Sequence, residues 1–79
     1  MDVDALNRTI GDEIRAARAR LNLSRKELAE LSGLSAKTIQ RLEGAERSAD
    51  IVQMNALCEV FGETVADLLG RAVARVRKE

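Results

Sequence analysis

Four residues between positions 36 and 41 have side chains suited to specific recognition chemistry. If this segment is a helix with Ile39 and Leu42 facing inward, a rotation of about 100° per residue turns these four outward. Arginine can pair bidentately with guanine, glutamine can pair with adenine, and alanine can touch the thymine methyl. The alternative is an ordinary solvated helix face. The outward residues are Ala36, Lys37, Gln40 and Arg41.

Three further cations flank this segment. Arg25 and Lys26 fall in the first turn of another predicted helix, where cations are locally unfavourable but backbone N–H groups favour an anion. Arg47 follows in a polar loop. Lys37 could neutralise a phosphate instead of reading a base. We expect these cations to hold the phosphates of a nucleic acid, with simple surface solvation as the alternative for each.

Two capped helices must position all of these side chains. Ser24 and Glu27 have the spacing of a capping box, and Ser35 can cap the next helix, which Gly44 closes. Gly33 falls where a helix must end with positive φ. Two helices with three residues between them predict a helix-turn-helix. Their expected core positions are Leu28, Ala29, Leu31, Leu34, Ile39 and Leu42.

The N-terminal segment carries one apolar stripe with helical spacing. It predicts a helix from about residue 4 to 21, weakened by Gly11. Thr9 and Asp12 could instead cap a helix that starts later. We favour the longer helix. The stripe consists of Val3, Leu6, Ile10, Ile14, Ala17 and Leu21.

Two more helices follow, so the sequence predicts an all-α, five-helix domain. Asp50 and Gly62 bound the fourth helix, and Thr64 with Asp67 opens the fifth. The expected core positions are Ile51, Met54, Leu57, Cys58 and Phe61, then Val65, Leu68 and Leu69. Seventy-nine residues make a single domain, with its core in about residues 4–69.

The apolar stripe of the fifth helix continues beyond this core. Residues 70–79 are therefore either a helical extension, reaching about residue 77, or a frayed tail. An apolar stripe without a cover favours a second subunit. The predicted dimer interface consists of Val65, Leu69, Ala72, Val73 and Val76.

Composition excludes several classes of function. The chain has no histidine and a single cysteine, Cys58, which excludes a zinc site built on these residues and any triad with an imidazole base. No phosphate-binding glycine motif is present, so we expect no enzyme and no cofactor. No stretch has the length and apolarity of a signal peptide or a membrane span. A lone cysteine fits a reducing cytosol, so we expect a cytoplasmic protein.

The zero net charge hides a segregated charge pattern. Residues 15–47 carry eight bases and four acids, a net charge of +4, and residues 71–79 carry +3. Residues 1–14 carry −3 and residues 48–70 carry −4. Such a field can steer a polyanion, although most free-standing DNA-binding domains are more basic.

The motifs together resemble the lambda-repressor-like helix-turn-helix family, also called Cro/C1-type or XRE-like. The resemblance covers about residues 10–69. It lies in Ile10-Gly11, Ile14-Arg15, the run LSRKELAELSGLSAKTIQRLE, and the segment from Leu57 to Leu69. It implies a compact five-helix domain that binds a palindromic operator as a dimer.

The resemblance also implies roles for individual residues. Base-reading positions fall on Ala36, Lys37 and Arg41, with Gln40 adjacent, and backbone contacts fall on Thr38 and the loop from Gly44 to Arg47. Arg25 stands where the family usually has a glutamine that contacts a phosphate, and Arg18 and Glu43 stand where the family often has a structural ion pair. This sequence also departs from the family pattern at three other positions. Ala45 replaces the usual loop glycine, Ala49 replaces the usual loop proline, and Glu63 occupies a position that is commonly apolar.

These observations support a homodimeric, sequence-specific regulator of transcription whose partner is double-stranded operator DNA. It would be similar to a phage Cro or repressor protein, to a restriction–modification controller, or to an autoregulating antitoxin. We expect no membrane partner. The alternative is a protein-interaction module, such as an antitoxin subunit, that does not bind DNA itself.

Overall fold

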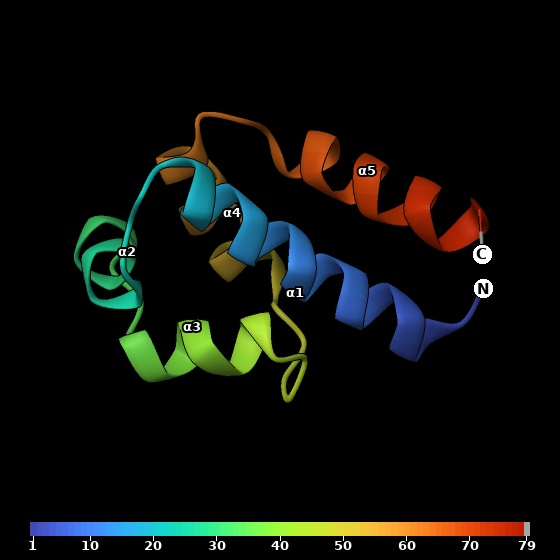
Figure 1. Ribbon diagram of the computed structural model, residues 1–79, viewed down its shortest axis with the longest axis horizontal. Coiled ribbons are helices and arrows are strands. Elements are labelled where there is room, and N and C mark those ends of the chain that lie inside the picture. Colours follow the sequence, from blue (N-terminus) through green and yellow to red (C-terminus); the bar gives the residue numbers. More distant parts are fainter. Residues whose placement is uncertain (79) are drawn as a thin grey trace.

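Residues 1–78 are described by a computed structural model, in which they form five α-helices and no strand (Figure 1). The predicted all-α architecture is therefore confirmed. The predicted domain includes residue 79, which lies outside the described residues. The helices are α1 (Val3–Arg20), α2 (Arg25–Ser32), α3 (Ala36–Glu43), α4 (Ile51–Phe61) and α5 (Val65–Lys78).

Short-range capping sets the ends of these helices. Ser24 and Glu27 form the predicted capping box, and the Ser35 hydroxyl accepts from the backbone N–H of Thr38 at 3.0 Å. Gly33 ends α2 with φ 80°. The suggestion that the first helix starts near Thr9 is wrong. Asp2 caps α1 instead, and the Thr9 hydroxyl donates to the Ala5 carbonyl within the helix.

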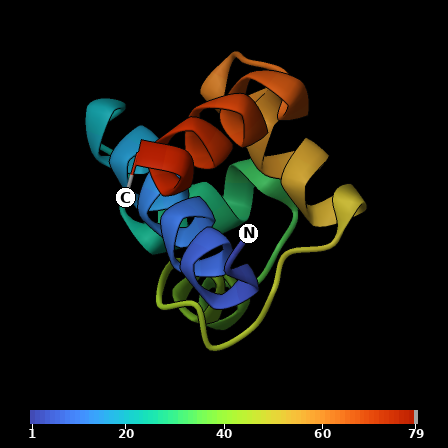
Figure 2. The same ribbon diagram turned by 90° about the vertical axis from the view of Figure 1, so that its right-hand side faces the viewer.

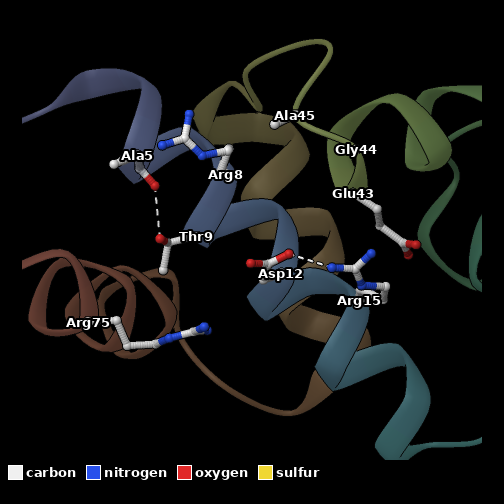
Figure 3. A pocket seen from close by; sticks show the side chains of 9 residues that line it. All are labelled: Ala5, Arg8, Thr9, Asp12, Arg15, Glu43, Gly44, Ala45 and Arg75. Atoms are coloured by element: carbon white, nitrogen blue, oxygen red, sulfur yellow. Dashed lines mark hydrogen bonds and ion pairs between the residues drawn. The ribbon is translucent and has the colours of Figure 1, made fainter. Parts of the chain in front are cut away.

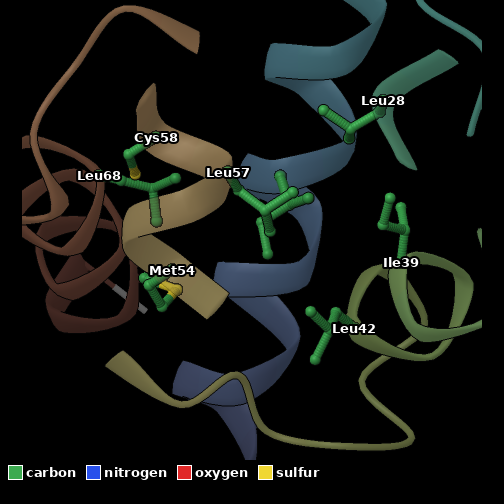
Figure 4. Packing of buried hydrophobic residues seen from close by; sticks show 8 residues of the cluster. Leu28, Ile39, Leu42, Met54, Leu57, Cys58 and Leu68 are labelled. Carbon is green, nitrogen blue, oxygen red and sulfur yellow. The ribbon is translucent and has the colours of Figure 1, made fainter. Parts of the chain in front are cut away.

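The core is aliphatic and gathers side chains from all five helices. Leu28 and Ile39 are fully buried, and Figure 4 shows them pointing toward the centre of the molecule, where Leu57 lies. Four positions expected in the core are instead exposed because they stand at helix ends, where a neighbouring helix does not cover them. Their exposed fractions are Val3 76%, Leu21 46%, Leu31 62% and Ile51 66%.

The contact between α1 and α3 explains Gly11. A Cβ at this position would lie 2.7 Å from the carbonyl oxygens of both Leu42 and Glu43. Both atoms are backbone, so they cannot move aside cheaply. The glycine that weakens α1 as an isolated helix therefore lets the end of α3 approach it closely.

The C-terminal extension is helical and packs on its own chain. Figures 1 and 2 show α5 alongside α1 over much of its length. Leu68 and Ala72 are fully buried there. The Glu13 carboxylate of α1 accepts hydrogen bonds from Arg71 at 2.8 Å and from Arg75 at 2.9 Å. Part of the stripe assigned to a dimer is thus covered by the protein's own first helix.

Candidate nucleic-acid interface

The two faces of α3 separate as the sequence predicts. Ile39 is fully buried and Leu42 is nearly so, because both pack into the core. The opposite face carries no apolar side chain larger than alanine. The side chains exposed there are Ala36, Lys37, Gln40 and Arg41. A capped helix therefore exposes two cations and an amide on one face.

Thr38, a predicted phosphate contact, lies at the start of α3. Its hydroxyl accepts a hydrogen bond from the Ser35 hydroxyl at 2.9 Å. The Thr38 hydroxyl proton has no acceptor among residues 1–78. Thr38 is half-buried, and its hydroxyl is held by the hydrogen bond from Ser35 at the start of α3. Its geometry is compatible with donation to a phosphate oxygen.

The ion pair between Arg18 and Glu43 is present and ties α1 to α3. Arg18 donates from Nε to Glu43 Oε2 at 2.7 Å and from Nη2 to Oε1 at 3.0 Å. The hydrogen bonds with Glu43 raise the pKa of Arg18, although burial opposes this effect. Arg18 also donates to the Leu23 carbonyl at 2.9 Å, which holds the connection that leads into α2.

The same carboxylate holds a second arginine. Arg25 donates from Nε to Glu43 Oε1 at 3.2 Å, so this residue is more than the free surface cation that the sequence suggested. Lys26 and Arg47 are exposed and have no ion-pair partner among residues 1–78. The three cations among the predicted phosphate contacts therefore differ, because only Arg25 is held by a carboxylate.

Ion pairs elsewhere hold further arginines. Glu63 accepts two hydrogen bonds from Arg71, at 2.6 and 2.9 Å, which explains a carboxylate at an otherwise apolar position. Burial raises the pKa of Glu13, but the hydrogen bonds and charges of Arg71 and Arg75 outweigh it, and the net shift is downward. Lys37 and Arg41 on α3 have no such partner within the described residues.

The loop after α3 has a support that the sequence did not reveal. Ala45 has φ 57°, in the left-handed region that favours glycine. Gly44 has φ −86°, outside that region. The Asn7 amide donates to the Ala45 carbonyl at 3.2 Å and connects this loop to α1. Asn7 therefore stabilises the segment that leads to Arg47, although nothing in its sequence context points to it.

A polar groove of about 340 Å³ lies beside this loop (Figure 3). Three arginines line it, but Arg15 pairs with Asp12 and Arg75 pairs with Glu13. Of these three arginines, only Arg8 lacks a carboxylate partner among residues 1–78. With two of the three arginines already paired, the groove is weakly suited to an anion.

Among residues 1–78 there is no group of three or more histidine, cysteine or acidic side chains placed to hold a metal ion. Burial, followed by the charge of Glu63, raises the pKa of the Cys58 thiol, which makes it a poor nucleophile. None of the described helices has the length and apolarity needed to cross a membrane.

Comparison with solved structures identifies two kinds of similar protein. The clp gene regulator ClgR from Corynebacterium glutamicum is similar in two crystal structures, with TM-scores of 0.81 and 0.79 and 28% identity. Each similarity covers 89% of this chain. It covers 74% of the ClgR chain in the first structure and 91% in the second. The restriction-modification controller protein C.AhdI from Aeromonas hydrophila has a TM-score of 0.74 at 26% identity, covering 77% of this chain and 92% of that one.

No curated protein matches the chain. A helix-turn-helix domain family matches residues 9–70, which include all of α2, α3 and α4. Together with the likeness to ClgR and C.AhdI, this match agrees with the resemblance seen in the sequence. The chain therefore belongs to the helix-turn-helix family of DNA-binding transcriptional regulators of the Cro/C1, XRE-like type.

Proposed function

We propose that this protein is a sequence-specific transcriptional regulator that binds a palindromic operator as a homodimer, with α3 in the major groove. The observation that carries the proposal is the exposed, polar and cationic face of α3 above a fully buried apolar face. The major groove of B-DNA admits one α-helix, and its base edges offer a distinct pattern of donors and acceptors.

Each exposed residue of α3 has a matching partner in that groove. Arg41 suits guanine O6 and N7, and Gln40 suits adenine N6 and N7. Lys37 can donate to guanine, and Ala36 can contact a thymine methyl. Gln40 and Arg41, which are adjacent near the end of α3, would thus read different bases.

The residues around α3 are placed to hold the DNA backbone. Arg25 and Lys26 stand at the start of α2, where unpaired N–H groups favour a phosphate. Thr38 and Arg47 flank the reading face at the start of α3 and in the loop that follows it. Such contacts carry no sequence information, but they set the register of the helix in the groove.

Dimerisation is proposed through the part of the α5 stripe that α1 leaves accessible. Val65, Leu69, Val73 and Val76 are half-buried, whereas Ala72 is fully buried inside the chain and has no surface to offer. A groove of about 510 Å³ continues this surface, lined by Met1, Asp2, Ala5, Val76 and Arg77. Two copies would also double the few free cations that face the DNA.

Selection of bound sites from random duplex DNA tests the proposal. We expect enrichment of a two-fold symmetric sequence, with binding that weakens steeply with salt, by a slope of about 0.9 for each phosphate neutralised. A folded protein that enriches no sequence would contradict specific recognition. Enrichment of a single half-site would contradict the dimer but leave α3 as the reading helix.

The second candidate is an interaction module that does not bind DNA. The observation in its favour is the zero net charge, together with the internal ion pairs of Arg71 and Arg75. A gel shift at low salt with the promoter of its own gene separates the two candidates. Absence of a shifted band, for a folded dimer, favours the interaction module.

A further inference from the structure

Glu43 joins three helices although it is only the last residue of α3. Its carboxylate is 1% exposed and accepts hydrogen bonds from Arg18 of α1 and from Arg25 of α2. The Oε1 atom is shared between them, with Arg18 Nη2 at 3.0 Å and Arg25 Nε at 3.2 Å. The recognition helix is therefore connected directly to the start of α2.

Arg18 alone balances the charge of this carboxylate. It makes two hydrogen bonds to Glu43, a third to the Leu23 carbonyl, and its side chain is only 17% exposed. Arg18 thus has one accepting partner for each of its three nitrogen atoms. The charge of Arg25 is then surplus, and this small cluster has a net charge of +1.

Arg25 uses only one of its three nitrogen atoms within the protein. Its Nε donates to Glu43, whereas Nη1 and Nη2 have no hydrogen-bond partner among residues 1–78. The side chain is 44% exposed, so part of it faces solvent. Anchoring by Nε leaves the fork of the guanidinium free, and that fork matches the geometry of a phosphate.

The backbone beside this fork also favours an anion. The capping box occupies the N–H groups of Ser24 and Glu27. The N–H groups of Arg25 and Lys26 fall in the first turn, where a helix offers them no internal acceptor. Two free amides, the positive end of the helix dipole and a held guanidinium thus meet at one place.

We propose that Glu43 is a positioning residue that holds Arg25 for a DNA phosphate, and this inference rests on the proposed DNA binding. An arginine that is free in solution loses side-chain entropy when it binds. Because Glu43 already restricts the Arg25 side chain in the free protein, less side-chain entropy is lost when Arg25 binds. Because Glu43 belongs to α3, it also fixes the phosphate contact relative to the residues that read bases.

A double-mutant cycle with Arg25→Lys and Glu43→Gln tests the coupling. Lysine keeps the charge, but its single ammonium cannot pair with Glu43 and offer a separate fork. Fluorescence anisotropy with a labelled duplex carrying the selected site should show about tenfold weaker binding for Arg25→Lys, with an unchanged salt slope. In the Glu43→Gln background the same change should weaken binding by about twofold or less.

Arg47→Lys is the matched control, because Arg47 has no carboxylate anchor within residues 1–78. Its effect on binding should be the same whether position 43 is glutamate or glutamine. Circular dichroism confirms that each variant is folded at the temperature used. An equal Arg25→Lys penalty in both backgrounds, or no penalty in either, would overturn the positioning role.

Nuclear magnetic resonance of the wild-type protein gives a test that does not depend on the folding of Glu43→Gln. The Arg25 Nε–H should exchange slowly with solvent in the free protein, and the duplex should shift the Nη signals while Nε–H stays protected. Fast exchange of Nε–H in either state would overturn the anchoring. A protected Nε–H in a protein that binds no duplex at low salt would overturn the proposed function and with it the phosphate role.

Discussion

At the scale of single residues, the cations of this protein divide into two groups. Arg18, Arg71 and Arg75 are held by carboxylates of the fold, whereas Lys37 and Arg41 have no partner among residues 1–78. Free charges on a rigid helix retain their full attraction for an external anion. The total charge of zero therefore understates the positive charge that is available to an external anion.

Lys37→Ala and Arg41→Ala test the reading face of α3. Each should weaken binding by about 1–3 kcal/mol at a half-site and relax the base preference at one position. Anisotropy with the selected duplex and with single-base variants measures both effects. Arg20→Ala, on the last turn of α1, serves as a control that should preserve base preference. If both α3 variants keep wild-type affinity and selectivity, another element reads the bases.

At the scale of the elements, close helix packing determines where the proposed reading face of α3 lies. Gly11 allows the end of α3 to approach α1, and the ion pair between Arg18 and Glu43 connects the same two helices. On the other side of α1, Glu13 ties α5 to α1 through Arg71 and Arg75. Both α3 and α5 thus pack against α1.

Gly11→Ala should destabilise the fold by about 1–3 kcal/mol, because the added Cβ would clash with two backbone carbonyl oxygens. Gly70→Ala is the matched control in another helix, since a Cβ there meets no atom within 4 Å. Because alanine favours a helix, this control should be neutral or up to about 1 kcal/mol stabilising. Urea denaturation measures both changes. Equal stabilities of the two variants would contradict the close contact.

Glu13 should make the docking of α5 sensitive to acid. Its pKa in the folded chain lies below the ordinary value of 4.5. The ionised carboxylate therefore stabilises the fold at neutral pH, and this contribution is lost as the pH falls below 4.5 through the folded pKa. At neutral pH, Glu13→Gln should reduce the free energy of unfolding by about 2 kcal/mol.

Thermal unfolding across the acid range checks this expectation. The difference in Tm between the wild type and Glu13→Gln should shrink as the pH falls below 4.5. Glu30→Gln, at an exposed glutamate without an ion pair in residues 1–78, should show no such change. A difference for Glu13→Gln that is constant with pH would contradict the role of its charge.

At the scale of the whole molecule, the proposed dimer depends on a narrow surface. Helix α5 uses Leu68 and Ala72 for its own core, which leaves the half-buried valines at its far end and the neighbouring Met1. Small domains bury limited apolar surface, so a second subunit would add stability as well as binding strength. This surface is distant in sequence from the helix-turn-helix.

Val73→Asp combined with Val76→Asp should convert the dimer into a folded monomer. Two carboxylates in an apolar interface would be desolvated without partners. Sedimentation equilibrium measures the mass, and circular dichroism checks the fold. Val52→Asp, at a valine that is 74% exposed on α4, is the control and should leave the dimer intact. A dimer that survives the double change would place the interface elsewhere.

Much of the fold and of the candidate site could be predicted from local patterns. The caps at Ser24 and Ser35 and the turn at Gly33 depend on residues a few positions apart, and each prediction is confirmed. Helical periodicity also placed Ile39 inward correctly, but it failed for Leu31. Periodicity shows which side of a helix is apolar, whereas burial at a helix end depends on whether another helix reaches that far.

The sequence by itself determined the five helices, the glycine turn and the outward face of α3, because caps, periodicity and turn conformations are short-range interactions. Only the tertiary structure decided that Glu43 serves both Arg18 and Arg25, and that Glu13 meets arginines 58 and 62 positions away. It also gave Gly11 its role. These features depend on how helices pack, and packing brings together residues whose separation in sequence carries no local signal.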